Sequence, residues 1–517
     1  SNKRNESQLT IKRVVHAYEN MFSDMAYGQI GSSGNCNNNV ACFPAWSKES
    51  DAVALVLLSN GTEWCSGSLL MTANQSFRPY FLSAFHCIDT DIPKGSLSSS
   101  EISNAENWMF KFQYKMSSCS GGYATSGVTY NRATFRAAWN NTDFALMELR
   151  NSPAGDSRFS WLGWDRSGNA PTAGTGIHHP SGDVMKISFD NDLITETAAG
   201  STNSGTTHWF VDIDNGTLEH GSSGSPLFNP QKKVIGQLHN GYPGCNSSKQ
   251  FWYGCFHRSW AGGGTNSTRL SNWLDPNGSG VITTNTSKSP TVSGPSSVCD
   301  QATYTVENLP AGAIVEWSVS NPNVATISNN GVLQVTNQTF ALTNIQANIF
   351  TGGENPYTIR KERVMTGQPK FEIQPLGYSG SNFASFFLTP QGEYGDLQSI
   401  PLNYRWSYTK IDGSGYTLIG DYQNTSFLNI EPVVTFPGPG TYMITVQITG
   451  YPCYIPLVRY KHSCGSNFFT LSPNPATDEV TLQLMETDEV SGLSVLSTDR
   501  SAYEIQIWSG MRMLRSF

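Results

Sequence analysis

The stretch Gly221-Ser222-Ser223-Gly224-Ser225-Pro226 is the most informative segment of this chain of 517 residues. Small residues on both sides of a serine let the backbone turn tightly, so that one hydroxyl is exposed and successive N–H groups face a developing negative charge. Turns rich in Gly and Ser are common in this sequence, and the stretch alone does not separate such a site from an ordinary loop. Two other segments give it a chemical interpretation.

One segment supplies a base and the other an acid. FLSAFHC at residues 81–87 is an apolar run that ends with His86 beside a cysteine, and NTDFALMEL at 141–149 places Asp143 at the start of an alternating strand. A nucleophilic serine needs a base to accept its proton, and the base needs a carboxylate that fixes its tautomer. The order His86, Asp143, Ser223 therefore predicts a catalytic triad, with the first two residues in one barrel and Ser223 in another.

Several separated motifs together resemble the lysyl endopeptidase branch of the chymotrypsin-like serine proteases. They are CSGSLL (65–70), HC (86–87), DFAL (143–146), GWD (163–165), IHHP (177–180), GSSGSP (221–226) and IGQLH (235–239). The resemblance covers roughly residues 31–275. It implies two six-stranded antiparallel barrels, an active site in the cleft between them, and hydrolysis of peptide bonds through an acyl-enzyme.

The resemblance also implies a role for each residue of this site. His86 is expected to be the general base, Asp143 the residue that orients it and Ser223 the nucleophile. The backbone N–H groups of Gly221 and Ser223 are expected to form the oxyanion hole. Ser223 takes the Ser position of the family's Gly-x-Ser-Gly-x-Pro frame, whereas Ser225 takes a variable position of it and is expected to be scaffold.

The specificity pocket is where this chain departs from the family. In the lysyl branch an Asp two residues before a Tyr-Gly pair supplies the negative charge that binds lysine. The pair here is Tyr253-Gly254, and Phe251 stands at the Asp position. A buried cation without a carboxylate partner is strongly penalised. Glu219 matches a second acid of the family's pocket, so a preference for Lys or Arg remains the leading expectation.

Two other specificities stay open. Phe251 and Thr217 could form an uncharged pocket for apolar residues, or His220 and His239 could receive an acidic residue. The family stacks a Trp on the histidine that matches His239, and no Trp occurs at 198–202, where it would be expected. The sequence therefore predicts that this aromatic support is lost.

Ten cysteines without a CxxC metal pattern are typical of disulfides in an exported protein. The resemblance implies the pairs Cys36–Cys245, Cys42–Cys119 and Cys65–Cys87. The pairing of the other four stays open, with a short loop from Cys453 to Cys464 as one option and Cys255 and Cys299 free or paired.

The neighbouring residues His178, His179 and Asp183 could be interpreted as metal ligands, but they match the family's His-His-Pro turn, which favours a structural role. We predict no metal and no cofactor. Chymotrypsin has an Asp before its nucleophile that pairs with a freshly cut amino terminus, and Ser222 stands there in this chain. Activation by an inserted amine is therefore not expected.

The composition limits the class of protein. The chain has 32 Lys and Arg residues and 40 Asp and Glu residues, and its net charge of -8 disfavours a nucleic-acid partner. Only 14% of its residues are charged, which disfavours charge-driven disorder. Gly, Pro and aromatic residues are many, and stretches of helix-forming residues at helical spacing are few, which predicts an all-β chain. No stretch approaches the roughly 20 apolar residues of a membrane helix.

The domain organisation follows from composition and strand pattern. A turn-rich linker lies at 275–297, and Asn330-Gly331 between two apolar runs predicts a hairpin. Gly440-Thr441-Tyr442 resembles a tyrosine corner. The predicted parts are an N-terminal extension or pro-segment (1–30), a chymotrypsin-like protease (31–285), two immunoglobulin-like modules (286–370 and 371–465) and a truncated C-terminal sorting domain (466–517). The extension, if a pro-segment, is expected to act by blocking or by assisting folding.

The last part bears on location. FTLSPNPATD at 469–478 followed by VTL at 480–482 resembles the start of the sorting domain of the type IX secretion system. That resemblance implies secretion machinery as a partner and a secreted or bacterial cell-surface location.

The leading hypothesis is an exported serine endopeptidase that cuts proteins or peptides. The rival is a surface adhesin on a protease scaffold without turnover, and the presence of all three triad candidates disfavours it. The physiological substrate and the oligomeric state stay open.

Overall fold

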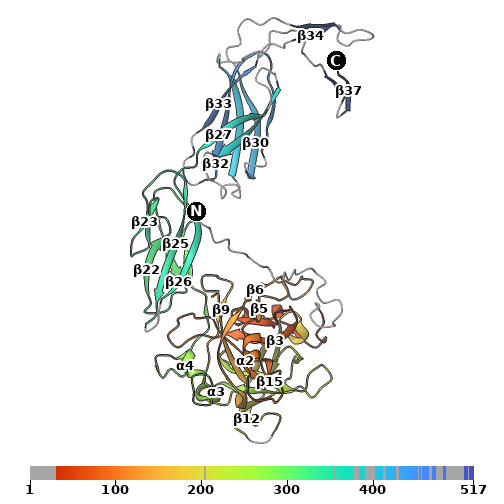
Figure 1. The fold of residues 1–517 in the computed structure, drawn as a ribbon, viewed down its shortest axis with the longest axis vertical. Coiled ribbons are helices and arrows are strands. Elements are labelled where there is room, and N and C mark those ends of the chain that lie inside the picture. The colour runs from red at the N-terminus through yellow and green to blue at the C-terminus, as the bar shows by residue number, and fades with distance from the viewer. Residues whose placement is uncertain are drawn as a thin grey trace, which may run out of the picture. The chain divides into compact units, whose positions relative to one another are not determined.

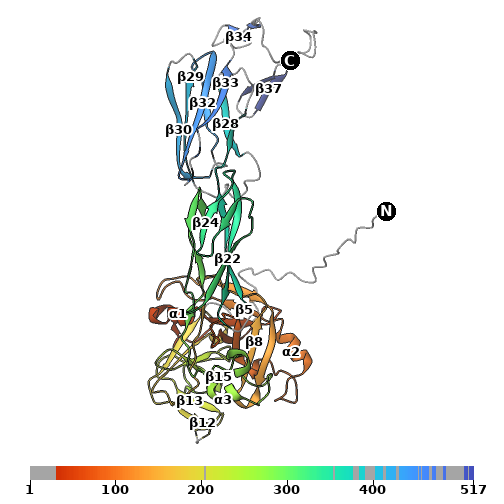
Figure 2. The ribbon, with the colours of Figure 1, turned by 90° about the vertical axis from the view of Figure 1, so that its left-hand side faces the viewer.

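Strands dominate the part of the chain that the structure describes. This computed structural model describes residues 31–202, 205–352, 356–376, 383–390, 402–411, 415–426, 430–451, 453, 455 and 457–464, and the strand backbones at 469–472, 481–484, 506–509 and 512–516. The ribbon shows arrows throughout and few coiled segments (Figure 1, Figure 2). The expectation of an all-β chain is confirmed. The predicted extension at 1–30 lies outside the described residues.

Two compact units make up the chain, one ending at Gly367 and the other beginning at Gln368. Four short α-helices occur in the described residues, namely α1 (Ser47–Ser50), α2 (Ser99–Ala105), α3 (Phe256–Ala261) and α4 (Ser271–Leu274). A capping box between Ser98 and Glu101 starts α2. None of the described helices is long and apolar enough to span a bilayer.

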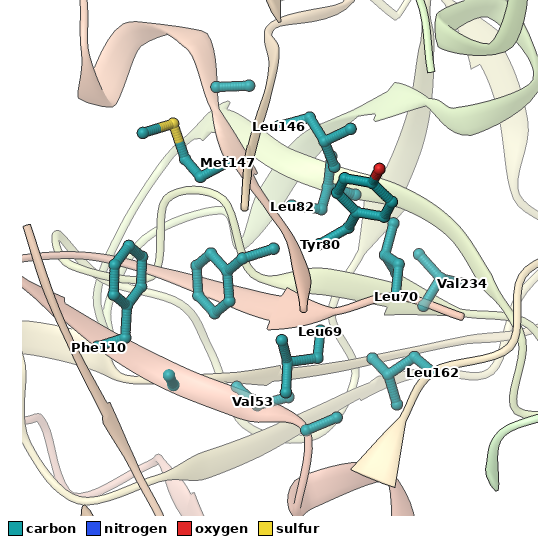
Figure 3. Close-up of a cluster of buried hydrophobic side chains, with 14 of the residues drawn as sticks. Val53, Leu69, Leu70, Tyr80, Leu82, Phe110, Leu146, Met147, Leu162 and Val234 are labelled. Atoms are coloured by element: carbon teal, nitrogen blue, oxygen red, sulfur yellow. The ribbon is translucent and has the colours of Figure 1, made fainter. Parts of the chain in front are cut away.

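The first large sheet has seven antiparallel strands in the order β6-β5-β2-β3-β4-β8-β7. Their bounds are β2 (Val53–Leu57), β3 (Glu63–Leu69), β4 (Tyr80–Ala84), β5 (Met109–Phe112), β6 (Val128–Asn131), β7 (Ala133–Trp139) and β8 (Phe144–Leu149). Every residue of β2, β4 and β8 is buried, which explains their nearly continuous apolar sequences. Figure 3 shows part of the resulting core, with side chains such as Val53, Leu82 and Leu146 gathered together.

The second large sheet has eight strands in the order β1-β11-β10-β14-β15-β16-β13-β12. They are β1 (Asn38–Asn39), β10 (Gly174–His178), β11 (Lys186–Asp190), β12 (Thr195–Thr197), β13 (His208–Asp212), β14 (Pro226–Phe228), β15 (Val234–Gly241) and β16 (Gln250–Cys255). The strand counts of seven and eight differ from the six that the resemblance implied. In the larger sheet the short edge strands β1 and β12 extend the pairing on either side.

One hydrophobic core joins the two large sheets. Phe228 of β14 and Val234 of β15 belong to the same buried cluster as Leu69 and Leu146 of the first sheet. Side chains in a close-packed interior interdigitate, so one sheet cannot easily shift over the other, and this shared core fixes the two sheets relative to each other. Residues from different sheets can therefore meet with a defined geometry.

Three smaller sheets, with the orders β18-β21, β19-β26-β25-β22 and β20-β24-β23, complete the described part of the first unit. β17 (Ser287–Lys288) pairs with β9 (Ser160–Trp161) and leads into strands between residues 291 and 366. These strands are β18 (Thr291–Ser293), β19 (Ser297–Val298), β20 (Gln301–Thr303), β21 (Thr305–Glu307), β22 (Ile314–Val319), β23 (Ala325–Ile327), β24 (Val332–Val335), β25 (Ala341–Phe350) and β26 (Tyr357–Thr366). The predicted hairpin is confirmed, since β23 and β24 pair and Gly331 has a φ of 75°.

The two larger sheets described in the second unit have the orders β27-β28-β31 and β30-β29-β32-β33. Their strands are β27 (Phe371–Leu376), β28 (Phe383–Pro390), β29 (Leu402–Lys410), β30 (Tyr416–Thr425), β31 (Val433–Thr435), β32 (Gly440–Thr449) and β33 (Val458–Cys464). The Tyr442 hydroxyl donates to the Gly438 carbonyl at 2.9 Å, as a tyrosine corner requires. Within the predicted sorting domain, only the strand backbones β34 (Phe469–Ser472), β35 (Thr481–Leu484), β36 (Gln506–Ser509) and β37 (Arg512–Ser516) are described, and the rest lies outside the described residues.

Six cysteines form the disulfides Cys36–Cys245, Cys42–Cys119 and Cys65–Cys87, which are the pairs that the resemblance implied. Disulfides of this kind each stabilise a fold by about 2–4 kcal/mol. Cys299 and Cys453 are also disulfide-bonded, whereas Cys255 and Cys464 are free and buried. The suggested link between Cys453 and Cys464 is therefore wrong, because β33 holds Cys464 buried in its sheet opposite Gly440.

Candidate active site

Two of the three predicted triad residues come from neighbouring strands of the seven-stranded sheet. His86 lies in a 3-10 turn directly after β4, and Asp143 immediately precedes β8. Since Ala84 pairs with Phe144 across these strands, the two side chains are brought to the same end of the sheet. Asp143 has a φ of 55°, and the His86 N–H donates to its Oδ1 at 2.9 Å. The carboxylate is thereby held under the imidazole.

Ser223 reaches the same point from the eight-stranded sheet. It lies in the turn of residues 219–224, here called the Ser223 turn, which leads into β14. His86 Nε2 is 2.9 Å from Ser223 Oγ, and His86 Nδ1 is 2.8 Å from Asp143 Oδ2. Asp143 is 1% exposed, so solvent cannot compete for its carboxylate. The structure thus brings the three predicted residues into one hydrogen-bonded line.

The charge of Asp143 determines how His86 titrates. Burial alone would lower the pKa of His86, but the negative charge and the hydrogen bond of Asp143 outweigh it and raise this pKa above the ordinary 6.5. Asp143 therefore favours the protonated imidazole, which is the form that a general base takes after it has accepted a proton.

The Ser223 turn depends on two glycines in the left-handed region. Gly221 has a φ of 90° and Gly224 a φ of 81°, and a Cβ on Gly224 would lie 2.5 Å from the Ser66 carbonyl oxygen. Ser66 holds the turn, since its N–H donates to the Ser223 carbonyl and its Oγ donates to the Gly221 carbonyl, both at 2.8 Å. The N–H groups of Gly221 and Ser223 donate to no other described residue. Ser225, by contrast, is buried behind the turn.

A buried histidine supports the same turn from below. Ser188 Oγ donates to the Thr217 carbonyl at 2.6 Å, so this hydroxyl accepts from His178 Nε2 at 3.1 Å. His178 Nδ1 is then the acceptor for the Ser222 hydroxyl at 2.8 Å. Burial lowers the pKa of His178 to about 3, which keeps the ring neutral. Both ring nitrogens are engaged, and His178 acts here as a structural support.

His179 has a separate structural contact, because its Nδ1 lies 3.0 Å from the Asp183 carbonyl. Among the described residues, three other groups have the side chains and spacing to hold a metal ion: His86 with Asp143 and His239, Glu196 with Cys255 and His257, and Asp190 with Asp192 and Asp214. The first is the triad itself. In the second, Glu196 is already paired with His257 at 2.6 Å.

Of the predicted specificity residues, Glu219, His220, His239 and Phe251 meet in a cavity of about 330 Å³ beside His86 and Ser223. Its lining consists of Glu219, His220, Leu238, His239, Asn240, Gly241, Pro243 and Phe251 in addition to those two residues. Thr217 is not among them. It is buried, and its hydroxyl donates to the Gly244 carbonyl at 3.2 Å. Phe251 of β16 is only 2% exposed and contributes an apolar wall.

Glu219 is the one carboxylate among these lining residues. Its Oε1 accepts from the Gly34 N–H and from Asn37 Nδ2, both at 2.8 Å. Its Oε2 accepts from Ser181 Oγ at 2.7 Å. The carboxylate is therefore fixed in orientation by three donors while it still lines the cavity.

A second cavity, of about 400 Å³, lies on the other side of the triad. Thr62, Glu63, Trp64, Ser181, Gly182, His220, Gly221 and the Cys65–Cys87 disulfide line it together with His86 and Ser223. Burial raises the pKa of Glu63 to about 7. Sequence reasoning missed Glu63, and its position two residues before the paired Cys65 is the only signal that could have found it.

His239 has a different partner from the one the family uses. His208, at the start of β13, lies with Nε2 2.9 Å from His239 Nδ1, and the ring centroids are 5.0 Å apart. His239 Nε2 in turn lies 3.9 Å from Asp143 Oδ1. The sequence analysis did not identify His208 as a contact of His239.

Comparison with known proteins gives matches over about half of the chain. Residues 30–255 match the family described as "Lysyl endopeptidase, C-terminal domain". Karilysin of Tannerella forsythia is 44% identical over 244 residues, covering 44% of this chain and 50% of its own length. Lysyl endopeptidase of Pseudomonas aeruginosa is 27% identical over 252 residues, covering 46% of this chain and 51% of its own.

The chain thus spans about half the length of these curated relatives. A solved structure of the Rv3671c protease of M. tuberculosis gives a TM-score of 0.27 at 12% identity over 42% of this chain and 89% of that one, a likeness too low to carry an argument. The family match and the second relative support a relationship to lysyl-endopeptidase-like proteases.

Proposed function

We propose that this chain is an exported serine endopeptidase with the two-barrel fold of the chymotrypsin-like enzymes, built from the two large sheets. The observation that carries the proposal is the line of short contacts from Ser223 through His86 to the buried Asp143. The match to the lysyl endopeptidase family over residues 30–255 supports it independently. The rival hypothesis of an adhesin without turnover has no comparable observation in its favour.

The proposed mechanism follows from the proton transfers that the contacts among Ser223, His86 and Asp143 allow. Ser223 Oγ attacks the carbonyl carbon of the substrate while His86 Nε2 accepts its proton, and Asp143 stabilises the imidazolium that forms. The N–H groups of Gly221 and Ser223 stabilise the negative oxygen of the tetrahedral intermediate. His86 then protonates the leaving amine, which leaves an acyl-enzyme on Ser223. Water, activated by His86, hydrolyses this ester and restores the enzyme.

An acyl-enzyme predicts a burst. With an activated ester substrate, we expect a rapid release of one leaving group per enzyme molecule, followed by slower steady turnover. A burst whose size equals the enzyme concentration supports the proposal. Steady release from the first turnover contradicts the proposal, if the burst amplitude is zero with activated esters of basic, apolar and acidic residues alike.

The pH dependence of kcat/KM should report His86. Activity requires the neutral imidazole, so it should fall as the pH drops through the pKa of His86, which Asp143 raises above 6.5. A pH profile between about pH 5 and 9 checks this, with Glu63→Gln as the matched control because Glu63 also lines the cleft and has a pKa of about 7. The acid limb should persist in the control. A flat profile would count against His86 as the general base. So would an acid limb that is present in the unmodified enzyme and absent from Glu63→Gln.

We also propose that Glu219 directs the enzyme towards Lys or Arg on the acyl side of the cut bond. Since a hydrogen bond to a charged group contributes about 1.5–3 kcal/mol, Glu219→Gln should lower kcat/KM for basic peptides about tenfold or more. The kcat/KM for apolar peptides should change little. Glu63→Gln, the matched control, should leave the ratio of kcat/KM for basic peptides to that for apolar peptides unaltered. Profiling with a peptide library measures this. If apolar residues dominate in the unmodified enzyme, Phe251 defines the pocket instead; if acidic residues dominate, His220 and His239 do.

The remaining parts are proposed to serve export and presentation. The three sheets at 291–366 and the sheets β27-β28-β31 and β30-β29-β32-β33 of the second unit are proposed to be two immunoglobulin-like modules. Residues 466–517 are proposed to be a sorting domain that engages type IX secretion machinery and delivers the enzyme to the medium or the cell surface. The substrates are then proteins or peptides met outside the cell.

A further inference from the structure

Cys255, the last residue of β16, carries a buried thiol that forms no disulfide. The three disulfides of the protease part leave it free, and it is 0% exposed. Its backbone is fixed, because its N–H donates to the Thr207 carbonyl at 2.9 Å and its carbonyl accepts from Ser259 Oγ at 3.1 Å. Within the described part of the chain, no group accepts a hydrogen bond from the thiol itself. The sulfur is therefore held in place and available as a ligand.

The eight-stranded sheet brings a carboxylate to the same face as this thiol. Glu196 of β12 pairs with Trp209 of β13, and Trp209 pairs with Tyr253 of β16. Residues directly opposite one another share a face of a sheet, and so do residues two apart along one strand. Tyr253 lies two residues before Cys255, so Glu196 and Cys255 lie on one face of the sheet.

His257, in the first turn of α3, adds a third donor at this point. One ligand atom each from Glu196, Cys255 and His257 all lie within 4.8 Å of one another. The imidazole is held by packing, since its centroid lies 5.4 Å from that of the Trp209 ring, and a Cβ on Gly168 would lie 3.2 Å from its Cδ2. A single ion could therefore contact sulfur, nitrogen and oxygen without a rearrangement of the sheet.

The two oxygens of Glu196 have different partners. Oε2 accepts from Arg258 at 3.1 Å, and Oε1 lies 2.6 Å from His257 Nε2. Arg258 thus holds one oxygen, while the other shares a hydrogen with the imidazole that a metal ion can replace. The side chain of Arg258 is 45% exposed, so solvent screens its repulsion of a bound cation.

The donor set and its exposure suit Zn²⁺. Thiolate, imidazole and carboxylate are the protein ligands that Zn²⁺ prefers, in tetrahedral geometry with bonds of about 2.0–2.3 Å. At such bond lengths neighbouring ligands lie about 3.3 Å apart, so Glu196 Oε1 would move away from His257 by less than about 1 Å. The side chains of Glu196 and His257 are 22% and 14% exposed, which leaves a path for the ion and a position for water.

We propose that Glu196, Cys255 and His257 bind a Zn²⁺ ion, with a water molecule as the fourth ligand. A Zn–S bond forms as the S–H bond of Cys255 breaks and its proton passes to solvent, and neutral His257 then carries its hydrogen on Nδ1. Burial raises the pKa of the Cys255 thiol, so the metal ion itself is needed to displace this proton near neutral pH. The sequence predicted no metal, because no motif joins Glu196 to the other two residues.

The ion is expected to support the fold rather than to take part in hydrolysis. None of its three ligands lines either cavity of the cleft. β12 is the last strand of its sheet and has only three residues, and it pairs with β13 alone. The metal would join Glu196 of this edge to the end of β16, whose residue Phe251 forms a wall of the proposed specificity pocket. A ligand that binds only the folded chain stabilises it.

The test is a titration of the full chain with Co²⁺ and then Zn²⁺, with the disulfides intact and metal first removed by a chelator. Co²⁺ occupies the same kinds of nitrogen, oxygen and sulfur sites as Zn²⁺, and a thiolate ligand gives it a charge-transfer absorption band that imidazole and carboxylate do not give. We expect this band to saturate at one Co²⁺ per chain and to disappear when Zn²⁺ is added. Zn²⁺ should also raise the temperature of thermal unfolding.

Cys255→Ser should remove the thiolate band, and Cys464→Ser is the matched control, because Cys464 is the other free and buried cysteine of the described residues. The band should be unchanged in that control. Glu196→Gln keeps the shape of the side chain and the thiol but removes the carboxylate charge. It should weaken Co²⁺ binding at least about tenfold, since even partners of metal ligands contribute that much.

Three outcomes would overturn the inference. The first is the absence of a thiolate band from the unmodified chain in a large excess of Co²⁺, and the second is a band that survives in Cys255→Ser or is lost in Cys464→Ser. The third is binding without a thiolate band that His239→Gln abolishes, which would place the ion at the group of His86, Asp143 and His239. If Cys255→Ser fails to fold, Glu196→Gln decides, because unchanged Co²⁺ affinity in that variant contradicts the site.

Discussion

Ser223→Ala is expected to lower the turnover number by about 10⁶, because the substitution removes the proposed nucleophile and the residues of such a triad act as a unit. The hydroxyl that the substitution removes lies 2.9 Å from His86 Nε2 and lines both cavities of the cleft. Hydrolysis of a peptide substrate, followed to long times at high enzyme concentration, measures the residual rate.

Ser225→Ala is the matched control for this substitution. Ser225 directly follows the Ser223 turn but is buried and lines neither cavity of the cleft, so its loss should change turnover by less than about tenfold. Folding of both variants is compared by thermal unfolding. If Ser223→Ala keeps more than a few per cent of the activity, or if Ser225→Ala is the variant that abolishes it, the assignment of the nucleophile is wrong.

Asp143→Asn is expected to lower turnover by about 10⁴, the size seen when the orienting acid of such a triad becomes an amide. Asp143 Oδ2 accepts from His86 Nδ1 at 2.8 Å, which leaves Nε2 unprotonated and ready to receive the Ser223 proton. An amide nitrogen at that position would donate to Nδ1 and move the ring proton to Nε2, where it would face Ser223. The serine would then lack a base.

Asp89→Asn is the control, since Asp89 is also buried near His86 and contributes to its pKa, but its carboxylate accepts from the Gly95 N–H. Its replacement should alter turnover by less than about tenfold. Steady-state kcat at the pH optimum of each variant is the measurement. Equal losses in the two variants would show that charge near His86, rather than the contact with Asp143, explains the effect.

The triad could be predicted from sequence because each member belongs to a local motif. His86 follows an apolar strand, Asp143 precedes one, and Ser223 lies between glycines, so that each signal is contained within a few residues. The all-β class followed in the same way from turn-forming residues and alternating strands. These features depend on local backbone geometry, which short stretches of sequence describe well.

The supporting contacts could not be predicted, because they join residues that only the packing of the sheets brings together. His208 meets His239 through the pairing of β13 with β16 and of β16 with β15, and neither residue lies in a recognisable motif with the other. The Gly31 N–H donates to Asp183 Oδ1 at 3.1 Å across 152 positions of the chain. Thr217 shows another limit of sequence: it lies two positions before Glu219, yet its side chain is buried and its hydroxyl donates to the Gly244 carbonyl.

The central claim is that Ser223, activated by His86, is the nucleophile of a peptidase. The most direct test is the mass of the intact chain after reaction with a fluorophosphonate, followed by mapping of the modified peptide. We predict a single adduct per molecule on Ser223, absent from Ser223→Ala and strongly slowed in His86→Ala. An unmodified chain, or an adduct on any other residue that persists in Ser223→Ala, would contradict the account.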